Sequence, residues 1–381
     1  MPNMSVPVVP KFFNTAGPGI PGDHYMIDPL RRIDYENISA LIDQKRYFVL
    51  HAPRQTGKTT SLLAMVERIN AEGRYRCAYL NVELAQTARS DVNKGMKAIL
   101  SSLEGVAGRY LGCQLSGSPA EIVARNDGNA ALVSELGALC CTLDRPLVLF
   151  IDEIDALVGD TLVSVLRQLR TGYTNRPQSF PISVILCGVR DVRDYRISTS
   201  DGDVITGGSC FNIKAESLRL GDFSGDEIRE LYLQHTEATG QTFEENIYPR
   251  VWELTRGQPW LVNALAHEAT WRMKDARDRS VPITLARIDQ AAENLIIGHT
   301  THLDQLIDKL SEPRIRHVIE PLFSGDATPR CLPDDDVSYV LDLGLVKLKN
   351  GIGNMEIANA IYKEAIPRKL AWATGAGASI C

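Results

Sequence analysis

The sequence predicts an α/β domain with a central parallel sheet, followed by a helical domain and a small third domain. Three observations predict this class: short runs that are apolar on both faces, helical segments between those runs, and a change to helical patterns after about residue 220. Strands that alternate with helices along a chain form a parallel sheet that helices cover on both faces. A chain of 381 residues is long enough for such a domain and for one or two more.

Four short apolar runs indicate the strands of this sheet, because strands that are buried on both faces lack polar alternation. The segments between them, at 59–69, 96–111 and 161–173, have helical spacing. We therefore expect an α/β domain over 23–222, preceded by an extended arm at 1–22 that is rich in Pro and Gly. The four runs are YFVLHA at 47–52, CAYLNVEL at 77–84, LVLFIDEI at 147–154 and ISVILCGV at 182–189.

The remainder of the chain predicts two further domains. A helical lid is expected over 223–300, with helices at 225–239, 245–256, 260–274 and 284–297. Over 301–372, helical stretches precede YVLDLGLVKLKNGIGNMEIANAIY, which indicates two strands, a Gly/Asn turn and a final helix. Helices followed by a hairpin predict a winged-helix domain. The last residues, 373–381, are small and are expected to form a flexible tail.

Charge and hydropathy exclude some classes of protein. The formal net charge is −6, and no stretch approaches the roughly 18 apolar residues of a membrane span. The N-terminus has no basic start followed by an apolar segment, so we expect no secretory signal. A cytoplasmic protein without a membrane partner is therefore expected, and nucleic acid is not the favoured partner.

A candidate phosphate-binding loop follows the first predicted strand and opens the next helix. In such a loop, backbone N–H groups surround the phosphates, the lysine reaches the β and γ groups, and the threonine hydroxyl ligates magnesium. The motif G-x-x-x-x-G-K-[ST] is met except at its first position, where alanine is acceptable if the residue ends the strand with a negative φ. The predicted nucleotide-binding residues are Ala52, Pro53, Arg54, Gln55, Thr56, Gly57, Lys58, Thr59 and Thr60.

An acidic pair, Asp152 and Glu153, ends the third predicted strand. Ligands bind at this edge of a parallel sheet. Asp152 is predicted to hold Mg²⁺ together with Thr59, and Glu153 to orient and polarise the attacking water. The alternative is that the pair caps the following helix, a role that we assign to Asp155 instead.

Arg190 follows the fourth predicted strand, in ISVILCGVRDVRDYR. A cation at this edge would lie near the γ-phosphate of a bound nucleotide, so we predict that Arg190 senses or stabilises that charge. Arg193 and Arg196 are close enough in the sequence to share the role. The alternative is a surface arginine that pairs with Asp191 or Asp194.

Together these motifs resemble the AAA-related STAND class of signal-transduction ATPases, in particular the bacterial and archaeal AAA-like ATP-binding proteins whose P-loop reads PRQTGKTT. The resemblance covers about residues 11–372, and its most specific parts are HAPRQTGKTT, FIDEID, CGVRDVRDY, LTRGQPWLVNALA and IANAIY. It implies a P-loop NTPase fold with a helical lid and a winged-helix domain. It also implies ATP or ADP with Mg²⁺ as ligands, and slow hydrolysis of ATP to ADP and phosphate.

The resemblance also suggests where adenine and ribose bind. In that family a G-x-P proline lines the adenine–ribose pocket, and Pro259 matches it, although a proline is equally suited to the first position of a helix. The apolar-Gly-Arg motif of the family is absent, because HYMIDPLRRID has Arg31 and Arg32 without a preceding glycine. Tyr25 and Leu30 are the residues predicted to form the wall there.

The favoured function is an ATP-driven molecular switch, in which the nucleotide state controls domain arrangement or self-assembly. No repeat or effector segment follows residue 372, so the effector is expected in a separate protein, unless the chain is a shortened member of the family. The alternative is an ATP-dependent DNA-handling protein whose winged helix binds duplex DNA. A major-groove helix needs clustered Lys and Arg, whereas the third domain has an aspartate run at 334–336.

Overall fold

The computed structural model of the chain describes residues 10–191, 195–198, 204–298, 303, 306, 308–324, 333–349 and 355–375. The chain divides into two compact units. The lid unit comprises Met1–Arg32, Arg54–Gly57 and Gly221–Cys381, and the sheet unit comprises Ile33–Pro53 and Lys58–Leu220. Each unit has a hydrophobic core of its own.

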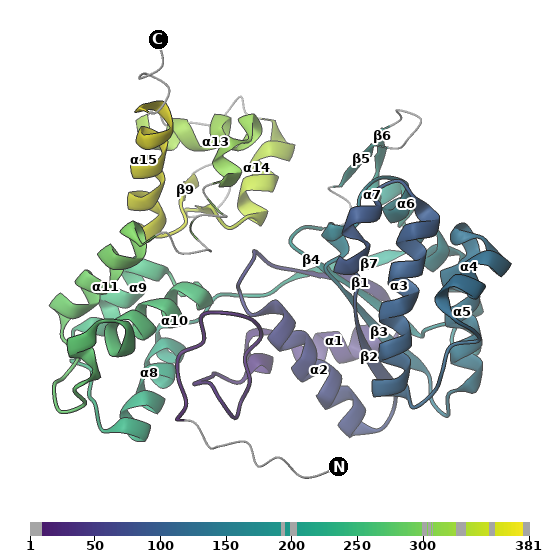
Figure 1. Ribbon diagram of the computed structural model, residues 1–381, viewed down its shortest axis with the longest axis horizontal. Helices are drawn as coiled ribbons and strands as arrows, with labels where there is room; N and C mark the ends of the chain where they lie inside the picture. The colour runs from purple at the N-terminus through teal and green to yellow at the C-terminus, as the bar shows by residue number, and fades with distance from the viewer. Residues whose placement is uncertain are drawn as a thin grey trace. The chain divides into compact units, whose positions relative to one another are not determined.

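A five-stranded parallel sheet forms the centre of the sheet unit, in the order β2-β3-β4-β1-β7 (Figure 1). In β1, β3 and β4 almost every side chain is buried, as expected for strands that are covered on both faces. This confirms the predicted α/β fold with a central parallel sheet. The strands are β1 (Tyr47–His51), β2 (Arg76–Asn81), β3 (Leu147–Asp152), β4 (Ser183–Gly188) and β7 (Lys214–Arg219).

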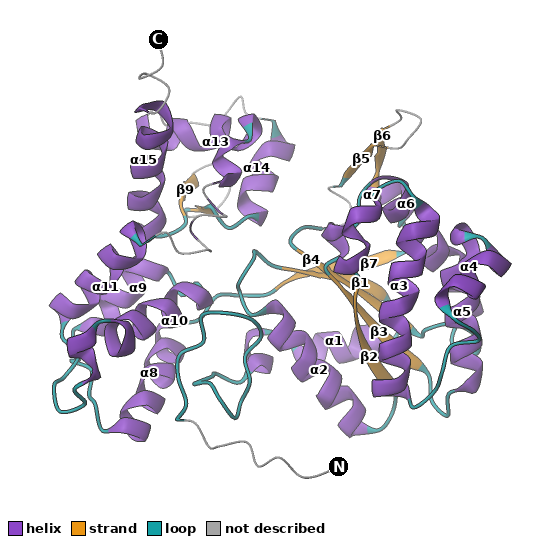
Figure 2. Cartoon of the chain, in the orientation of Figure 1, coloured by secondary structure: helices purple, strands orange, loops and turns teal. Residues whose placement is uncertain are grey.

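Helices cover both faces of the sheet (Figure 2). One face is covered by α1 (Tyr35–Asp43) and α2 (Lys58–Glu72), and the other by α3 (Val92–Val106), α5 (Gly128–Thr142) and α6 (Gly159–Gly172). α4 (Pro119–Asn126) packs against α3 and α5. Alternate side chains of β3, namely Leu147, Leu149 and Ile151, join the apolar cluster on the α3 side, as the period of two along a strand requires.

The strand registers align the carboxyl ends of four strands at one edge of the sheet. Asn81 at the end of β2 lies opposite Asp152 at the end of β3, and His51 at the end of β1 lies opposite Gly188 at the end of β4. The loops that follow these strands therefore start side by side. Open parallel sheets bind their ligands at this edge.

Some elements of the sheet unit differ from the sequence prediction. β7 was not predicted because KAESLR is polar and partly exposed, as an edge strand can be. The hairpin of β5 (Arg196–Ser198) and β6 (Val204–Thr206) was not predicted either, nor were α1, α4, α5 and the short α7 (Gly207–Cys210). The apolar run at 77–84 is only partly strand. The side chain of Asn81 accepts the N–H of Glu83 at 2.8 Å and turns the chain into the 3-10 helix Glu83–Ala88.

The lid unit begins its helical part just after β7 (Figure 2). The first helix starts at a capping box formed by Ser224 and Glu227, and ends at Gly240, whose φ is 76°. The helices are α8 (Gly225–Thr239), α9 (Ile247–Thr255), α10 (Pro259–His267), which continues as the π-helix Glu268–Arg272, and α11 (Leu285–Ile297). The predicted helical lid is therefore present.

The third segment has the predicted order of a winged helix, with helices followed by a hairpin and a final helix. One detail of the prediction is wrong: residues 339–342, expected in a strand, end α14. Three aspartates occupy the first turn of this helix, where the helix dipole favours negative charge. The predicted turn at 350–354 lies outside the described residues. The elements are α13 (Pro313–Ser324), α14 (Asp334–Asp342), β8 (Val346–Leu348), β9 (Met355–Ile357) and α15 (Ala360–Gly375).

One apolar cluster joins the parts of the lid unit. It includes Phe13 and Tyr25 near the N-terminus, the faces of α8 to α11, and Ile361 and Ile366 on α15. The N-terminal segment is fixed to the helices by two hydrogen bonds between the backbone of Met26 and the side chain of Gln234, and by one from Nε1 of Trp260 to the carbonyl of Thr15. α15 extends to Gly375, beyond the predicted boundary at 372, and residues 376–381 of the predicted tail lie outside the described residues. Among the described residues, the structure has no helix with the length and apolar character needed to span a membrane.

Candidate active site

The loop between β1 and α2 has the backbone of a phosphate-binding loop. The N–H of Ala52 donates to the carbonyl of Gly188 at 3.2 Å, so the first residue of the motif still belongs to the sheet. The positive φ angles of the loop are at Gln55 (60°) and Gly57 (79°). Glycine is therefore not required at position 52. This explains why the first position of the motif can be an alanine.

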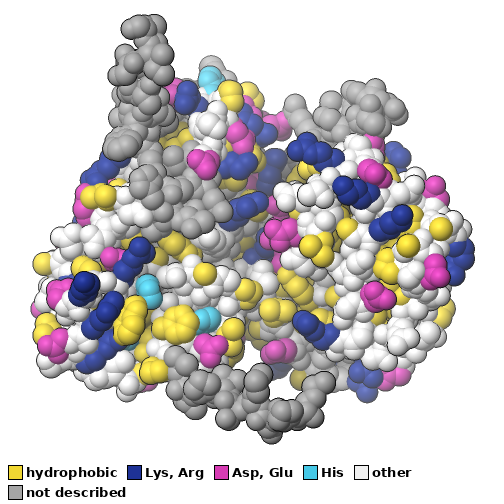
Figure 3. Space-filling view, viewed as in Figure 1, with side chains coloured by type: hydrophobic (Ala, Val, Ile, Leu, Met, Phe, Trp, Pro, Cys, Tyr) yellow, Lys and Arg dark blue, Asp and Glu magenta, His cyan; other side chains and the backbone are white. Residues whose placement is uncertain are grey.

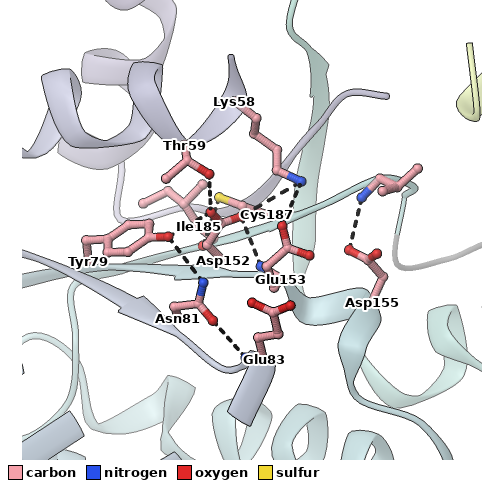
Figure 4. Close-up of polar contacts among 11 residues, drawn as sticks. Lys58, Thr59, Tyr79, Asn81, Glu83, Asp152, Glu153, Asp155, Ile185 and Cys187 are labelled. Carbon is pink, nitrogen blue, oxygen red and sulfur yellow. Dashed lines mark hydrogen bonds and ion pairs between the residues drawn. The ribbon is translucent and has the colours of Figure 1, made fainter. Parts of the chain in front are cut away.

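Asp152 is the centre of a polar cluster at the edge of the sheet (Figure 4). Its carboxylate is fully buried, and its Oδ2 accepts hydrogen bonds from the hydroxyl groups of Thr59 at 3.0 Å and Tyr79 at 2.9 Å. Its Oδ1 accepts the N–H of Glu153 at 2.9 Å and lies 3.8 Å from Nζ of Lys58. These contacts offset the cost of burying a charged carboxylate.

Lys58 and Glu153 complete this cluster. Nζ of Lys58 lies 4.0 Å from Oε1 of Glu153, and the lysine is held between the two carboxylates by its position in the first turn of α2. Glu153 has φ 58° and ψ 38°, a left-handed conformation that costs energy for residues other than glycine and is often found at functional sites. Its side chain stays 30% exposed and can therefore meet a water molecule.

Two neighbouring groups, Tyr79 and His51, are uncharged at neutral pH. Burial, and then the charge of Asp152, raise the pKa of the Tyr79 phenol, so its hydroxyl is protonated and donates to the carboxylate. Burial lowers the pKa of His51, which immediately precedes the loop, to about 4. His51 is therefore neutral at pH 7 and adds no positive charge beside Lys58.

The end of β4 is linked to the acidic strand end. Oδ1 of Asp155 accepts the N–H of Val189 at 3.1 Å, so this carboxylate has a structural role. Arg190 comes next in the chain, at the predicted edge, and its guanidinium carbon lies 5.9 Å from the centroid of the Tyr195 ring.

The alternatives to Arg190 are only partly described. Asp191, which the sequence offered as a partner for Arg190, makes a buried ion pair with Lys214 on β7. Arg193 and the side chain of Arg196 lie outside the described residues. The arginine that faces the nucleotide therefore stays a prediction.

Thr59 and Asp152 fit a magnesium ion by the chemistry of their donor atoms. A hydroxyl and a carboxylate are hard oxygen ligands, and Mg²⁺ is commonly bound by one or two such protein groups together with water and phosphate oxygens. The two side chains already touch, at 3.0 Å, at the start of α2 and the end of β3. Among the described residues, no three His, Cys, Asp or Glu side chains are grouped so that they could hold a metal ion.

The predicted base-binding residues belong to the lid unit, separately from Lys58 and Asp152. Pro259 is buried at the first position of α10. Tyr25 is 3% exposed and packs against the rings of Phe13 and His235. Leu30 lies in the 3-10 helix Pro29–Arg32. Their contact with a nucleotide stays a prediction.

Two side chains of the lid unit hold backbone carbonyls of the phosphate-binding loop, whose residues 54–57 belong to this unit. Nη1 of Arg32 donates to the carbonyl of Thr56 at 2.8 Å, and the same guanidinium binds the carbonyl of Gly221. Nε2 of Gln258 donates to the carbonyl of Gln55 at 3.4 Å. Burial lowers the pKa of Arg32 to about 10, so it stays charged at neutral pH.

Sequence reasoning missed Tyr79, Arg32 and Gln258. A tyrosine and an asparagine two residues apart near the end of an otherwise apolar strand, CAYLN, place two polar groups on one face of β2 and could have indicated Tyr79. In the sequence, Arg32 drew attention only because no glycine precedes it, so that the apolar-Gly-Arg motif is absent. Its partners are backbone carbonyls, which leave no signal in a sequence.

Comparison with known proteins gives one family and several similar folds. The model of the family described as AAA domain (AAA_22) matches residues 42–195. The Walker-type ATPase paby2304 of Pyrococcus abyssi is similar in structure, with a TM-score of 0.58 and 14% identity over 93% of this chain and 99% of that chain. No curated protein matches the sequence.

Two other solved structures are similar at lower scores. The Aeropyrum pernix ORC2 protein, solved as ADPNP–ADP complexes, has a TM-score of 0.46 and 16% identity over 91% of this chain and 97% of that chain. Thermotoga maritima RuvB T158V has a TM-score of 0.43 and 13% identity over 86% of this chain and 92% of that chain. At such identities a likeness concerns the fold alone.

The family match covers the elements that build the polar cluster, from the end of α1 through β1, the loop, β3 and β4. A lysine and a threonine open the helix after β1, and an acidic pair lies at the end of β3, which β4 separates from β1 in the parallel sheet. By this match and this geometry, residues 42–195 are an AAA domain with the fold of a P-loop ATPase.

Proposed function

We propose that this protein is a magnesium-dependent, slow ATPase that works as a molecular switch of the AAA-like STAND class. The observation that supports hydrolysis best is the cluster around Asp152, where Thr59 donates to one carboxylate oxygen and Lys58 lies 3.8 Å from the other. Bound ATP and Mg²⁺ would meet these groups at the carboxyl edge of the sheet.

In this proposal each side chain has one task. The loop from Ala52 to Thr60 surrounds the phosphates, with Lys58 reaching the β and γ groups. Thr59 and Asp152 hold Mg²⁺, which neutralises charge on the phosphates when it is bound. Glu153 orients the attacking water. Arg190 senses the γ-phosphate, and Pro259, Tyr25 and Leu30 line the site of the base and ribose.

The switch is supported by the contacts between the loop and the rest of the lid unit. Arg32 joins the Thr56 carbonyl to the Gly221 carbonyl, at the start of the helical part of the chain. Gln258, which caps α10, donates to the Gln55 carbonyl. A loop that closes around phosphates would alter these bonds, so its nucleotide state would reach the lid (223–300) and the third domain (301–372). The outcome would be self-association or binding of a separate effector in the cytoplasm.

A DNA-handling ATPase is the second candidate, because the order of α13, α14, β8, β9 and α15 is that of a winged helix. The charges of this segment do not favour DNA binding. Figure 3 shows basic and acidic side chains next to each other over α13 and α14. Six of its cations are in ion pairs with carboxylates: Lys309, Arg314, Arg316, Lys347, Lys349 and Arg368.

Tryptophan fluorescence can test the switch directly. All four tryptophans lie between residues 252 and 372, in the lid unit, and none lies in the sheet unit. We expect a non-hydrolysable ATP analogue with Mg²⁺ to change their emission and the molar mass in solution, and ADP to give a different state. Lys58→Ala, which removes the cation beside Asp152, should abolish both responses because the nucleotide no longer binds.

The matched control is Lys94→Ala, which removes an exposed lysine from α3. Wild-type protein that binds the analogue with unchanged emission and mass would rule out the switch while leaving the ATPase assignment intact. Unchanged nucleotide affinity in Lys58→Ala would instead rule out the proposed phosphate site.

A further inference from the structure

Among the residues that the structure describes, Tyr79 is the aromatic side chain that binds the buried carboxylate of the site. Its hydroxyl donates to Oδ2 of Asp152 at 2.9 Å, to the same oxygen that accepts the Thr59 hydroxyl (Figure 4). It also accepts a long hydrogen bond from Nδ2 of Asn81 at 3.5 Å. β2 pairs with β3 along its whole length, so the two residues stand on neighbouring strands of one rigid sheet.

We propose that Tyr79 is a positioning residue for the magnesium-binding carboxylate, an inference that rests on the proposed Mg²⁺-dependent ATPase function. A carboxylate can rotate about its Cβ–Cγ bond, and the direction of its oxygens decides whether one of them can ligate a metal. Hydrogen bonds from surrounding side chains orient metal-binding carboxylates and are costly to remove. Tyr79 and Thr59 together fix Oδ2, and the Glu153 N–H fixes Oδ1.

In the proposed loaded site the Thr59 hydroxyl has a second partner. Once the Thr59 hydroxyl ligates Mg²⁺, its oxygen is held by the ion as well as by Asp152, whereas the Tyr79 phenol has no other carboxylate partner among its described contacts. The phenol therefore keeps Asp152 oriented whether or not nucleotide is present. Without the Tyr79 hydrogen bond, the Asp152 carboxylate would have to be ordered when the metal binds, and the affinity for the metal would be lower.

Tyr79 also lines a cavity of about 690 Å³ beside β2. Tyr110, from the π-helix Ala107–Leu111, lines the same cavity and makes no described hydrogen bond with Asp152. The two tyrosines thus line the same cavity, but only Tyr79 has a described hydrogen bond with Asp152. Tyr110→Phe is therefore the matched control for Tyr79→Phe, because both variants remove one hydroxyl from a tyrosine that lines this cavity.

The test measures how Mg²⁺ supports the binding of a fluorescent ADP analogue. We expect Tyr79→Phe to raise the Mg²⁺ concentration at half-saturation at least about tenfold, the scale of a lost hydrogen bond to a charged group. Affinity for the analogue in EDTA should stay at the wild-type value, because the phosphate loop is untouched. Tyr110→Phe should match wild type in both measurements.

A double-mutant cycle with Asp152→Asn separates positioning from general damage. In the Asp152→Asn background, Tyr79→Phe should cause no further change in the Mg²⁺ requirement. An equal loss in both backgrounds, or a wild-type Mg²⁺ requirement in Tyr79→Phe, would overturn the role of Tyr79. If wild-type protein binds the analogue without any Mg²⁺ dependence, the proposed magnesium site fails instead, which is a different outcome from either of these.

Discussion

Glu153 differs from its neighbours in its backbone. A left-handed conformation at a glutamate is maintained only where surrounding contacts impose it, and here the N–H of Glu153 is bound by the Asp152 carboxylate at 2.9 Å. The side chain is thereby turned toward Lys58 while part of it stays exposed. This is the arrangement expected of a group that meets a water molecule next to the phosphates.

Glu153→Gln should therefore keep ATP binding and lose turnover by about 10²-fold or more, because the amide is a poor acceptor for a proton from water. Equilibrium binding and steady-state hydrolysis by the same preparation measure the two effects. Glu83→Gln is the matched control, since Glu83 is an exposed carboxylate just after β2. Hydrolysis that falls in Glu83→Gln and not in Glu153→Gln would assign water activation to the other glutamate.

The site residues that could be predicted from the sequence are those that their neighbours along the chain make recognisable. Lys58 and Thr59 are recognisable because a strand and a helix flank them, and Asp152 and Glu153 because they end an apolar strand. Tyr79 and Arg32 act through partners that are far away in sequence, 73 and 24 residues. A single sequence has no pattern that links such pairs, so the structure was needed to find them.

At the scale of elements, the junction between α9 and α10 depends on one glycine. Gly257 has φ 78°, its carbonyl accepts the N–H of Phe223 at 2.8 Å, and a Cβ built on it would lie 2.0 Å from the carbonyl oxygen of Phe223. No side chain fits in this space. The junction also positions Gln258, which caps α10 and donates to the phosphate-binding loop.

Gly257→Ala should destabilise the lid unit by at least about 3 kcal/mol, because backbone strain and a steric clash with backbone add. Gly240→Ala is the control: its φ is 76° but no atom lies within 4 Å of the added Cβ, so only the strain of about 1 kcal/mol is expected. Urea unfolding followed by tryptophan fluorescence reports on the lid unit. Equal losses in the two variants would show that the contact with Phe223 relaxes without cost.

Elements were predictable where one pattern dominates the local sequence. The strands β1, β3 and β4 are continuous apolar runs, and α8 is framed by a capping box and a terminal glycine. β7 is mostly polar, as a strand at the edge of a sheet can be, and its pairing with β1 decides its structure. Residues 339–342 alternate like a strand but continue a helix whose N-terminal aspartates favour it.

At the scale of the whole molecule, the lid helices and the third segment share one apolar cluster. Ile361 and Ile366 of α15 pack with residues of α9 and α11, and Lys347 of β8 bonds Asp222 at 2.8 Å and the carbonyl of Arg256 at 3.3 Å. The third segment is therefore attached to the part of the chain that contacts the phosphate-binding loop. Deleting it would expose this core, so its function has to be tested in the full chain.

The third segment is expected to bind protein rather than duplex DNA. Lysines and arginines that are already paired with carboxylates must give up those pairs before they can neutralise phosphates, and each phosphate contact would appear as a steep dependence on salt. Anisotropy of a labelled mixed-sequence duplex, titrated with the full chain at about 150 mM salt, should show no submicromolar binding. The combined variant Arg316→Glu and Lys349→Glu removes two of these cations as the control. Submicromolar affinity that falls steeply with salt, and falls again in this variant, would favour the DNA-handling function over the switch.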